Sequence, residues 1–115
     1  MHELSIALSL VEGVLEQAEK QGGLKVEAVH LRLGILSGVD KEALAFSYTV
    51  ATEGTPLAQS RLVIEDVPLT IHCPSCGGER TLSTMQDLSC PVCKTPAQEI
   101  VNGREIEIAA LEVAA

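Results

Sequence analysis

Residues 4–20 carry apolar side chains at steps of three and four residues, the pattern of an amphipathic helix. The apolar stripe consists of Leu4, Ala7, Leu8, Val11, Val14, Leu15 and Ala18. Gly22 and Gly23 follow the stripe and are expected to end the helix. A second helix is predicted over residues 40–52, with Asp40 as its N-cap.

Residues 25–35 alternate between apolar and polar side chains, which predicts a half-buried strand. Its polar face carries His30, which we interpret as a solvated strand residue and not as a ligand. A second strand is predicted over residues 61–71, where Pro68 indicates an edge position or an irregularity. A third strand is predicted over residues 104–113.

These elements predict an α+β fold, in which two helices pack on a three-stranded sheet. A zinc-ribbon-like module is inserted between the second and third strands, which can pair antiparallel only if the module brings its own ends together. We expect residues 1–71 and 100–115 to form one α+β domain and residues 72–99 to form the module.

All four cysteines lie in one segment. It reads Cys73-Pro74-Ser75-Cys76, then thirteen residues, then Cys90-Pro91-Val92-Cys93. Two Cys-x-x-Cys pairs at this separation are a strong metal signal, because each short turn can direct both of its sulfurs at one ion. Pro74 and Pro91 restrict φ at the first turn residue, and Gly77 can take a positive φ just after the second thiolate. Four thiolates with no open position predict a structural, tetrahedral zinc site.

Two disulfides, or one disulfide and two free thiols, are the alternative arrangement of four cysteines. The sequence gives no secretory context, since its N-terminus lacks the positively charged region of a signal peptide. A reducing cytoplasm is therefore the expected location. Iron would suit the same four thiolates, and the spacing alone does not exclude it.

The net charge of −8 argues against nucleic acid as a partner, because such binding rests mainly on Lys and Arg at phosphates. With one Phe, one Tyr and no Trp, the chain also lacks an aromatic platform for stacked bases. No apolar run reaches the length of a membrane span. We find no phosphate-binding loop and no hydrolase motif, and a zinc ion held by four thiolates offers no open position, so we do not expect an enzyme.

The first residues, Met1-His2-Glu3, carry a second candidate metal site. A free α-amine has a pKa of about 7.7–8.0 and can bind a metal near neutral pH. The amine, the backbone nitrogen of His2 and its ring can close chelate rings around one ion, and deprotonated amides suit Ni(II) or Cu(II). The alternative is that His2 is an ordinary residue at a frayed terminus.

Three features together resemble the HypA/HybF family of nickel-insertion accessory proteins for [NiFe]-hydrogenase maturation. They are Met1-His2-Glu3 opening an amphipathic helix, the cysteine cluster, and the closing segment Gly103-Arg104-Glu105-Ile106-Glu107-Ile108 with Leu111-Glu112-Val113. The resemblance covers nearly the whole chain. The cysteine spacing is shared with many zinc ribbons, whereas its combination with the N-terminal triplet is much more specific.

The resemblance implies a nickel metallochaperone whose α+β domain binds Ni(II) through the Met1 amine, His2 and the backbone nitrogens of His2 and Glu3. It implies that the Glu3 side chain tunes the nickel site without being an assured ligand. It also implies zinc at Cys73, Cys76, Cys90 and Cys93. The implied partners are the GTPase HypB and the hydrogenase large-subunit precursor, with urease maturation proteins served by some members, and the implied state is a monomer or weak homodimer.

Two neighbouring side chains leave alternatives open. His72 directly precedes Cys73 and is expected to be structural, with a pH-sensitive role at the zinc site as the alternative. Asp40 is expected to be an N-cap, with orientation of the His2 ring as its alternative. For the whole protein, the competing hypothesis is a zinc-ribbon interaction module without nickel cargo.

Overall fold

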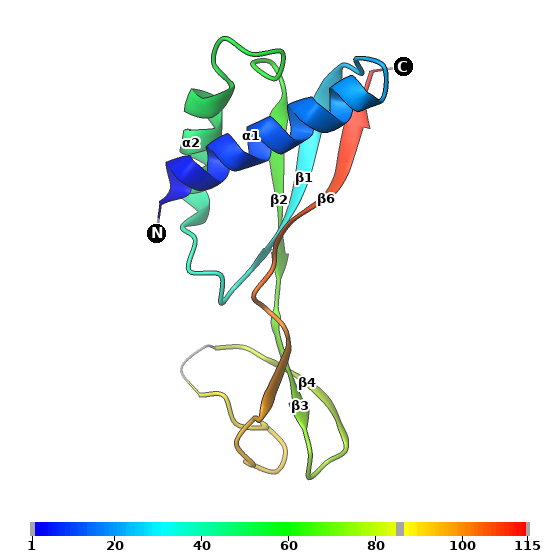
Figure 1. Cartoon of the computed structure of the whole chain (residues 1–115). Helices are drawn as coiled ribbons and strands as arrows, with labels where there is room; N and C mark the ends of the chain where they lie inside the picture. Colours follow the sequence, from blue (N-terminus) through cyan, green and yellow to red (C-terminus); the bar gives the residue numbers. More distant parts are fainter. Residues whose placement is uncertain (1, 85–86, 115) are drawn as a thin grey trace. The chain divides into compact units, whose positions relative to one another are not determined.

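The structure is a computed structural model that describes residues 2–84 and 87–114 (Figure 1). The elements are α1 (Glu3–Lys20), β1 (Val26–Gly34), α2 (Lys41–Thr52), β2 (Arg61–Val67), β3 (Leu69–Cys73), β4 (Gly78–Leu82), β5 (Glu99–Asn102) and β6 (Ile106–Val113). They form two three-stranded sheets, one in the order β2-β1-β6 and the other in the order β4-β3-β5. The predicted α+β class, with two helices and a sheet of the three predicted strands, is confirmed.

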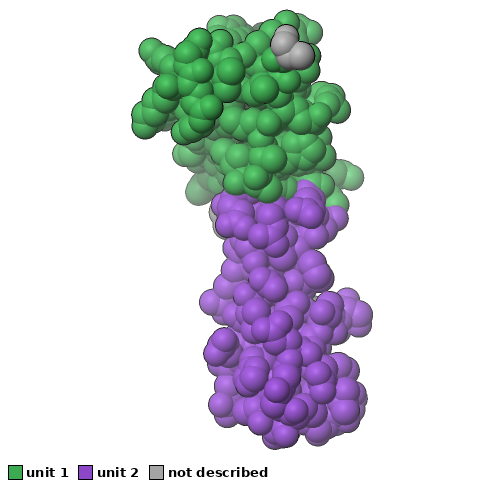
Figure 2. Space-filling view, turned by 90° about the vertical axis from the view of Figure 1, so that its right-hand side faces the viewer, with its two compact units in different colours: residues 1–31, 39–64, 108–115 green, residues 32–38, 65–107 purple. Residues whose placement is uncertain are grey.

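The chain divides into two compact units, which are coloured separately in Figure 2. Unit 1 comprises residues 1–31, 39–64 and 108–115, and unit 2 comprises residues 32–38 and 65–107. These ranges describe how the chain packs and not which metal each part binds. The predicted metal-binding division, with a zinc module over residues 72–99, therefore stays a prediction.

The core of unit 1 lies where both helices pack on one face of β1. The apolar stripe of α1 buries Ala7, Val11, Val14 and Ala18, four of its seven predicted members. These side chains meet Val29 and Leu31 of β1 and Leu44 and Tyr48 of α2, which are all buried. Burial of an aliphatic side chain of this size stabilises a fold by about 1.5–3 kcal/mol relative to exposure.

The ends of both helices follow the predicted signals. Asp40 caps α2, since its side chain accepts a hydrogen bond from the Ala43 backbone N–H at 3.1 Å. At the end of α1, Gly22 and Gly23 take φ values of +88° and +79°. This left-handed backbone, which favours glycine, lets the Gly23 N–H return to the Ala18 carbonyl oxygen at 2.9 Å.

The order of the strands corrects the expected pairing of the second and third predicted strands. The second and third predicted strands do not pair with each other, because β1 lies between β2 and β6. β1 is the most buried strand of this sheet, through Val26, Ala28, Val29, Leu31 and Leu33. A largely apolar strand is stabilised most at the centre of a sheet, where both of its faces can be covered. The ends of the cysteine segment meet instead in the second sheet, where β3 pairs antiparallel with β5.

The predicted strand over residues 61–71 is divided at Pro68 into β2 and β3. Proline has no backbone N–H to donate to a ladder, so a strand interruption at this residue is expected. The division separates the two sheets in sequence, since β2 belongs to the first and β3 to the second.

Unit 2 contains two strands that the hydrophobic pattern did not predict, β4 and β5. Both flank β3, whose Leu69 and Ile71 are fully buried. Leu82 completes a small core, and Leu36, Ala97 and Ile100 pack against it. The sequence therefore forms a second sheet immediately beside the cysteine pairs.

Candidate metal centres

The four cysteine sulfurs converge on one point in unit 2. All four lie within 4.8 Å of one another, and Cys73 Sγ is 3.4 Å from Cys93 Sγ while Cys76 Sγ is 3.9 Å from Cys90 Sγ. A tetrahedral ion with Zn–S bonds of about 2.3 Å has sulfur–sulfur edges of about 3.8 Å. A disulfide would need a separation near 2.05 Å. The four cysteines are free, and their spacing fits one tetrahedral ion better than two disulfides.

The first cysteine pair is held at the turn between β3 and β4. Cys73 ends β3, and the Gly77 N–H donates to its carbonyl oxygen at 2.9 Å. The Cys76 N–H donates to Cys73 Sγ at 3.4 Å. Gly77 has a φ of +69°, as the sequence predicted for the residue after the second thiolate.

The second cysteine pair has the same backbone turn without a glycine. Lys94 follows Cys93, takes a φ of +66°, and donates its N–H to the Cys90 carbonyl oxygen at 2.9 Å. The Cys90 N–H in turn donates to the Thr95 carbonyl oxygen at 2.8 Å. The two turns are therefore equivalent in their hydrogen bonding, and Lys94 occupies the place of Gly77.

Thr95 connects the two turns, which the cysteine spacing did not predict. Its hydroxyl lies 3.2 Å from Cys93 Sγ and donates to Ser75 Oγ in the first turn at 3.1 Å. The available signal was a hydroxyl residue two positions after the last cysteine, but only the folded structure brings it to Ser75.

The thiols differ in acidity because their hydrogen bonds differ. Hydrogen bonding with Thr95, first through its side chain and then through its backbone, lowers the pKa of Cys93 to about 6. Backbone hydrogen bonds, first from Cys93, lower the pKa of Cys90 although burial opposes them. Hydrogen bonds from Cys76 to Cys93 and Cys73 raise the pKa of Cys76 to about 12. In the metal-free cluster, Cys76 therefore keeps its proton most strongly, and Cys93 forms a thiolate most readily. A metal ion must displace the remaining thiol protons in order to bind.

The donor set fits a closed, structural ion. Cys73 and Cys90 are fully buried, whereas Cys76 and Cys93 face solvent. Four sulfur ligands at tetrahedral spacing suit zinc, and they also suit iron. Among the residues that the structure describes, these cysteines are the only group of histidine, cysteine and acidic ligand atoms close enough to hold one metal ion.

The second predicted site lies at the start of α1. Met1 is outside the described residues, so its amine has no described position. His2 is exposed and precedes the first helical residue, Glu3, while its carbonyl oxygen accepts the Ile6 N–H at 3.1 Å. The first four N–H groups of a helix have no partner within the helix, so the backbone nitrogens of His2 and Glu3 take no part in its hydrogen bonding.

The Glu3 side chain has a structural contact. Its Oε2 accepts the Asp40 backbone N–H at 3.2 Å and so joins the beginnings of α1 and α2. Asp40 is confirmed as the α2 N-cap, and its carboxylate bonds to Ala43 at that position. The predictions that Glu3 tunes a nickel site and that Asp40 orients the His2 ring stay predictions.

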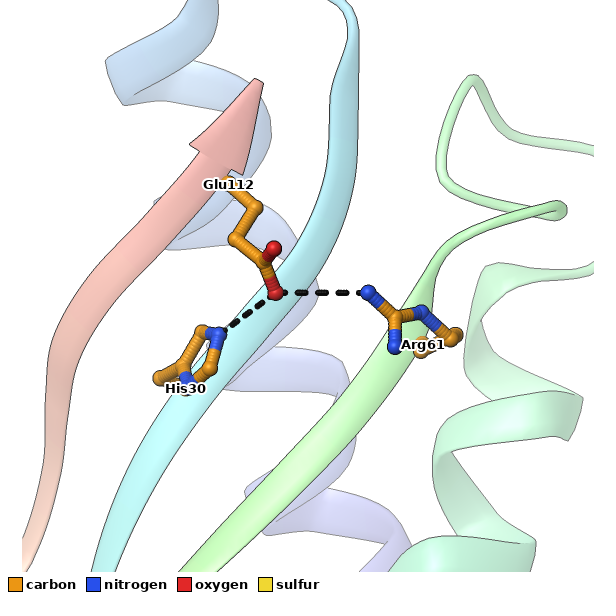
Figure 3. Close-up of polar contacts among 3 residues, drawn as sticks. All are labelled: His30, Arg61 and Glu112. Atoms are coloured by element: carbon orange, nitrogen blue, oxygen red, sulfur yellow. Dashed lines mark hydrogen bonds and ion pairs between the residues drawn. The ribbon is translucent and has the colours of Figure 1, made fainter. Parts of the chain in front are cut away.

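The other two histidines lie elsewhere. His30 Nε2 is 2.7 Å from Glu112 Oε2, which also accepts from Arg61 at 3.3 Å, across the polar face of β2, β1 and β6 (Figure 3). The His30 hydrogen bond, with the nearby charge of Arg61, lowers the pKa of Glu112. His72 lies in β3, between Glu79 of β4 and Glu99 of β5, and is not part of the four-sulfur group.

A family model described as hydrogenase/urease nickel incorporation, metallochaperone, HypA matches residues 1–113. The chain belongs to the HypA family. Among its relatives, a hydrogenase maturation factor HypA of Chloroflexus aurantiacus is 48% identical over 112 residues, covering 97% of this chain and 98% of that protein. The factor of a Roseiflexus species is 51% identical, covering 97% of this chain and 91% of that protein.

Solved structures agree with this membership. The fold is similar to the solution structure of the Ni metallochaperone HypA from Helicobacter pylori, with a TM-score of 0.71 and 26% sequence identity, covering 100% of this chain and 99% of that chain. The resemblance predicted from the sequence is confirmed at the level of the family. HypA members are hydrogenase maturation metallochaperones, and no helix in the described residues is long and apolar enough to cross a membrane.

Proposed function

We propose that this protein binds Ni(II) at its N-terminus and helps to insert it into the [NiFe]-hydrogenase large subunit, while Cys73, Cys76, Cys90 and Cys93 hold a structural zinc ion. The observation that carries the proposal is the match to the nickel-incorporation family over residues 1–113, which includes His2 and all four cysteines. The zinc assignment draws further support from the sulfur spacing.

The nickel donors are the Met1 amine, the backbone nitrogens of His2 and Glu3, and the His2 ring. Two deprotonated amides supply charges of −1 each and suit square-planar Ni(II). The complex then carries no net charge, so the positive end of the α1 dipole does not repel it. A doubly charged ion held by neutral ligands would be disfavoured at the same place.

Release of nickel follows from the same donors. Each amide, the amine and the imidazole can take back a proton, and a proton on any of them competes with the metal. The exposed position of His2 leaves the site open to a docking partner. The ion is therefore cargo, bound firmly enough to be carried and released when a partner changes the ligands.

The zinc ion has a different task. Four sulfur ligands would close its coordination sphere, so it would supply no bound water and no catalytic chemistry. Cys73 and Cys76 in one turn and Cys90 and Cys93 in the other would fix both turns beside the small core of unit 2. We assign this ion to structure and assign no enzymatic step to the protein.

The partners proposed on this function are the GTPase HypB and the hydrogenase large-subunit precursor, with urease maturation proteins as further candidates. The protein acts in the cytoplasm, where reducing conditions keep the four thiols available for zinc. It acts as a monomer or weak homodimer. Neither nucleic acid nor a membrane is proposed as a partner, given the net charge of −8.

The test is nickel titration of untagged protein by calorimetry. His2→Ala is expected to abolish nickel binding while leaving one zinc per chain, because the ring is the only side-chain donor assigned to the site. His30→Ala is the matched control, since it removes an imidazole that bonds to Glu112 and is not assigned to nickel. Unchanged nickel affinity in the His2 variant would refute the assignment.

A second experiment separates the amine from the ring. Two extra residues before Met1 leave every side chain in place and move the free amine away, so nickel affinity is expected to fall.

Glu3→Gln tests whether the Glu3 carboxylate tunes the nickel site. It keeps an oxygen that can accept the Asp40 N–H and removes only the negative charge, so a change in nickel affinity would come from that charge. If wild-type protein binds zinc and no nickel, the chain is a zinc-ribbon interaction module without nickel cargo.

A further inference from the structure

Each cysteine turn lies at the tip of a short antiparallel pairing. In the first, Cys73 is opposite Gly78 in the β3–β4 register. In the second, the Cys90 N–H donates to the Thr95 carbonyl oxygen at 2.8 Å. Thr95 therefore occupies in the second turn the position that Gly78 occupies in the first, and its backbone is fixed beside the sulfurs.

This correspondence shows that the four-sulfur group is not symmetric. The Thr95 hydroxyl lies 3.2 Å from Cys93 Sγ and 3.1 Å from Ser75 Oγ, so it joins the second turn to the first. The reverse contact would need hydroxyls at Gly78 and Val92, the residues at the corresponding positions, and neither carries one. A hydroxyl pair thus supports Cys93 and has no counterpart at the other cysteine pair.

The asymmetry concerns the two ligands that solvent can reach. Cys73 and Cys90 are fully buried, whereas Cys76 and Cys93 are exposed. A hydrogen bond to a charged acceptor is roughly twice as strong as one between neutral groups. It also draws electron density from the sulfur, so a thiolate that accepts from Thr95 is a weaker nucleophile than one without such a donor.

The hydroxyl pair can serve Cys93 both free and bound to a metal. As a thiol, Cys93 donates to Thr95, and Thr95 donates to Ser75. A sulfur bound to a metal carries no proton and only accepts. Because hydroxyl hydrogens rotate, Ser75 can then donate to Thr95 and Thr95 to Cys93. The heavy atoms keep their places, so the contacts of the free chain already suit the bound ligand.

We propose that Ser75 and Thr95 form a hydroxyl brace that holds Cys93 in the four-sulfur centre and leaves Cys76 as the sulfur at which the centre opens. The inference rests on the proposed occupancy of this centre by zinc. Neither hydroxyl is a metal ligand, and both act through Cys93, so they are positioning residues.

The test is a short pulse of iodoacetamide on zinc-loaded, full-length protein. Zinc is kept in slight excess so that metal-free molecules do not contribute. A sulfur that reacts forms a bond to the methylene carbon and releases iodide, which leaves a thioether in place of the thiolate. Mass spectrometry with peptide fragmentation gives the order of labelling. In wild type, Cys76 is expected to react before Cys93.

Thr95→Val keeps the shape of the side chain and removes the hydroxyl. Cys93 is then expected to react at least as fast as Cys76. Zinc affinity, measured by competition with a chromophoric chelator, is expected to fall by roughly 10-fold, the lower end of the range for partners of metal ligands. Thr95→Ser keeps the hydroxyl and is expected to retain the wild-type order.

Ser75→Ala removes the anchor of the brace and leaves the Thr95 hydroxyl. It is expected to accelerate labelling of Cys93 less than Thr95→Val does, and the double variant is expected to be no worse than Thr95→Val alone, because the two hydroxyls act as a unit. Thr81→Val is the matched control. It makes the same change at an exposed position of β4 opposite Thr70, and both order and affinity are expected to stay as in wild type.

The outcomes separate this inference from the function on which it rests. Wild-type protein that binds no zinc would refute the zinc assignment itself. Zinc-loaded wild type that is labelled at Cys93 first, or at Cys76 and Cys93 equally fast, would overturn the brace. Lower stability of Thr95→Val with the wild-type order of labelling would show a merely structural contact and would also overturn it. If Thr95→Val does not fold, the exposed change Ser75→Ala decides by the same order.

Discussion

Individual thiols of the cysteine cluster have different chemical environments. The Thr95 hydroxyl lies 3.2 Å from Cys93 Sγ, whereas Cys76 donates to its sulfur neighbours. The result is a pKa of about 6 for Cys93 and about 12 for Cys76 in the metal-free cluster. Because the thiolate is the nucleophile, the pair Cys93 and Thr95 determines where a metal-free chain reacts first.

We therefore expect iodoacetamide at pH 7 to label Cys93 before the other cysteines of metal-free protein. A lowered pKa means that the thiolate is present above about pH 6, so the preference should fade as the pH falls below that value. Peptide mass spectrometry after a short pulse measures the order of labelling. Thr95→Val should slow the reaction at Cys93, and labelling of Cys76 first would contradict the assigned order.

At the scale of secondary structure, the two Cys-x-x-Cys turns place different residues at the same left-handed backbone position. Both need a residue with positive φ directly after the second cysteine, namely Gly77 at +69° and Lys94 at +66°. A side chain in this region costs roughly 1–2 kcal/mol relative to glycine. The backbone of the second turn therefore carries a strain at Lys94 that the first turn lacks.

Gly77→Ala is expected to destabilise the zinc-loaded protein by about 1–2 kcal/mol in thermal or urea unfolding. A Cβ at Gly77 would have no atom within 4 Å, so backbone strain is the only cause. Lys94→Gly is the reciprocal change, and it should relieve strain and leave stability equal or higher. A Gly77→Ala protein as stable as wild type would show that the turn tolerates an alternative backbone.

The whole molecule consists of two units that depend on different interactions. Unit 1 has an apolar core of its own, in which Val14, Val29, Leu44 and Leu57 are almost fully buried. Unit 2 buries fewer large side chains, chiefly Leu69, Ile71 and Leu82, around the cysteine pairs. A small core of this kind would depend on the proposed zinc ion, because the binding free energy of a structural ion adds to the free energy of folding.

Removal of the proposed zinc ion by a chelator is accordingly expected to destabilise unit 2 and to leave the stability of unit 1 unchanged. Hydrogen exchange followed by mass spectrometry should show faster exchange in β3, β4 and β5 and unchanged protection in α1 and β1. Nickel binding that requires His2 should persist, since the proposed donors belong to unit 1. Loss of protection in α1 on zinc removal would contradict this independence.

The sequence predicted elements whose signal is local and strong. The apolar stripe of α1, the Asp40 cap and the paired glycines after Lys20 all appear as expected, because caps and glycine conformations depend on a few neighbouring residues. It did not predict β4 or β5. These strands have five and four residues, and β4 carries Glu79, Arg80 and Thr81 at its centre, so neither has an apolar alternation long enough to recognise.

By itself, the sequence predicted the two helices, the grouping of the four cysteines as a candidate metal site, and the resemblance to a nickel-incorporation family. Each depends on residue types at fixed short spacings. Only the tertiary structure decided that β1 lies between β2 and β6 and that Thr95 bridges the two cysteine turns. These features depend on contacts between residues distant in sequence or on which side of a strand faces a core, and no local pattern specifies either.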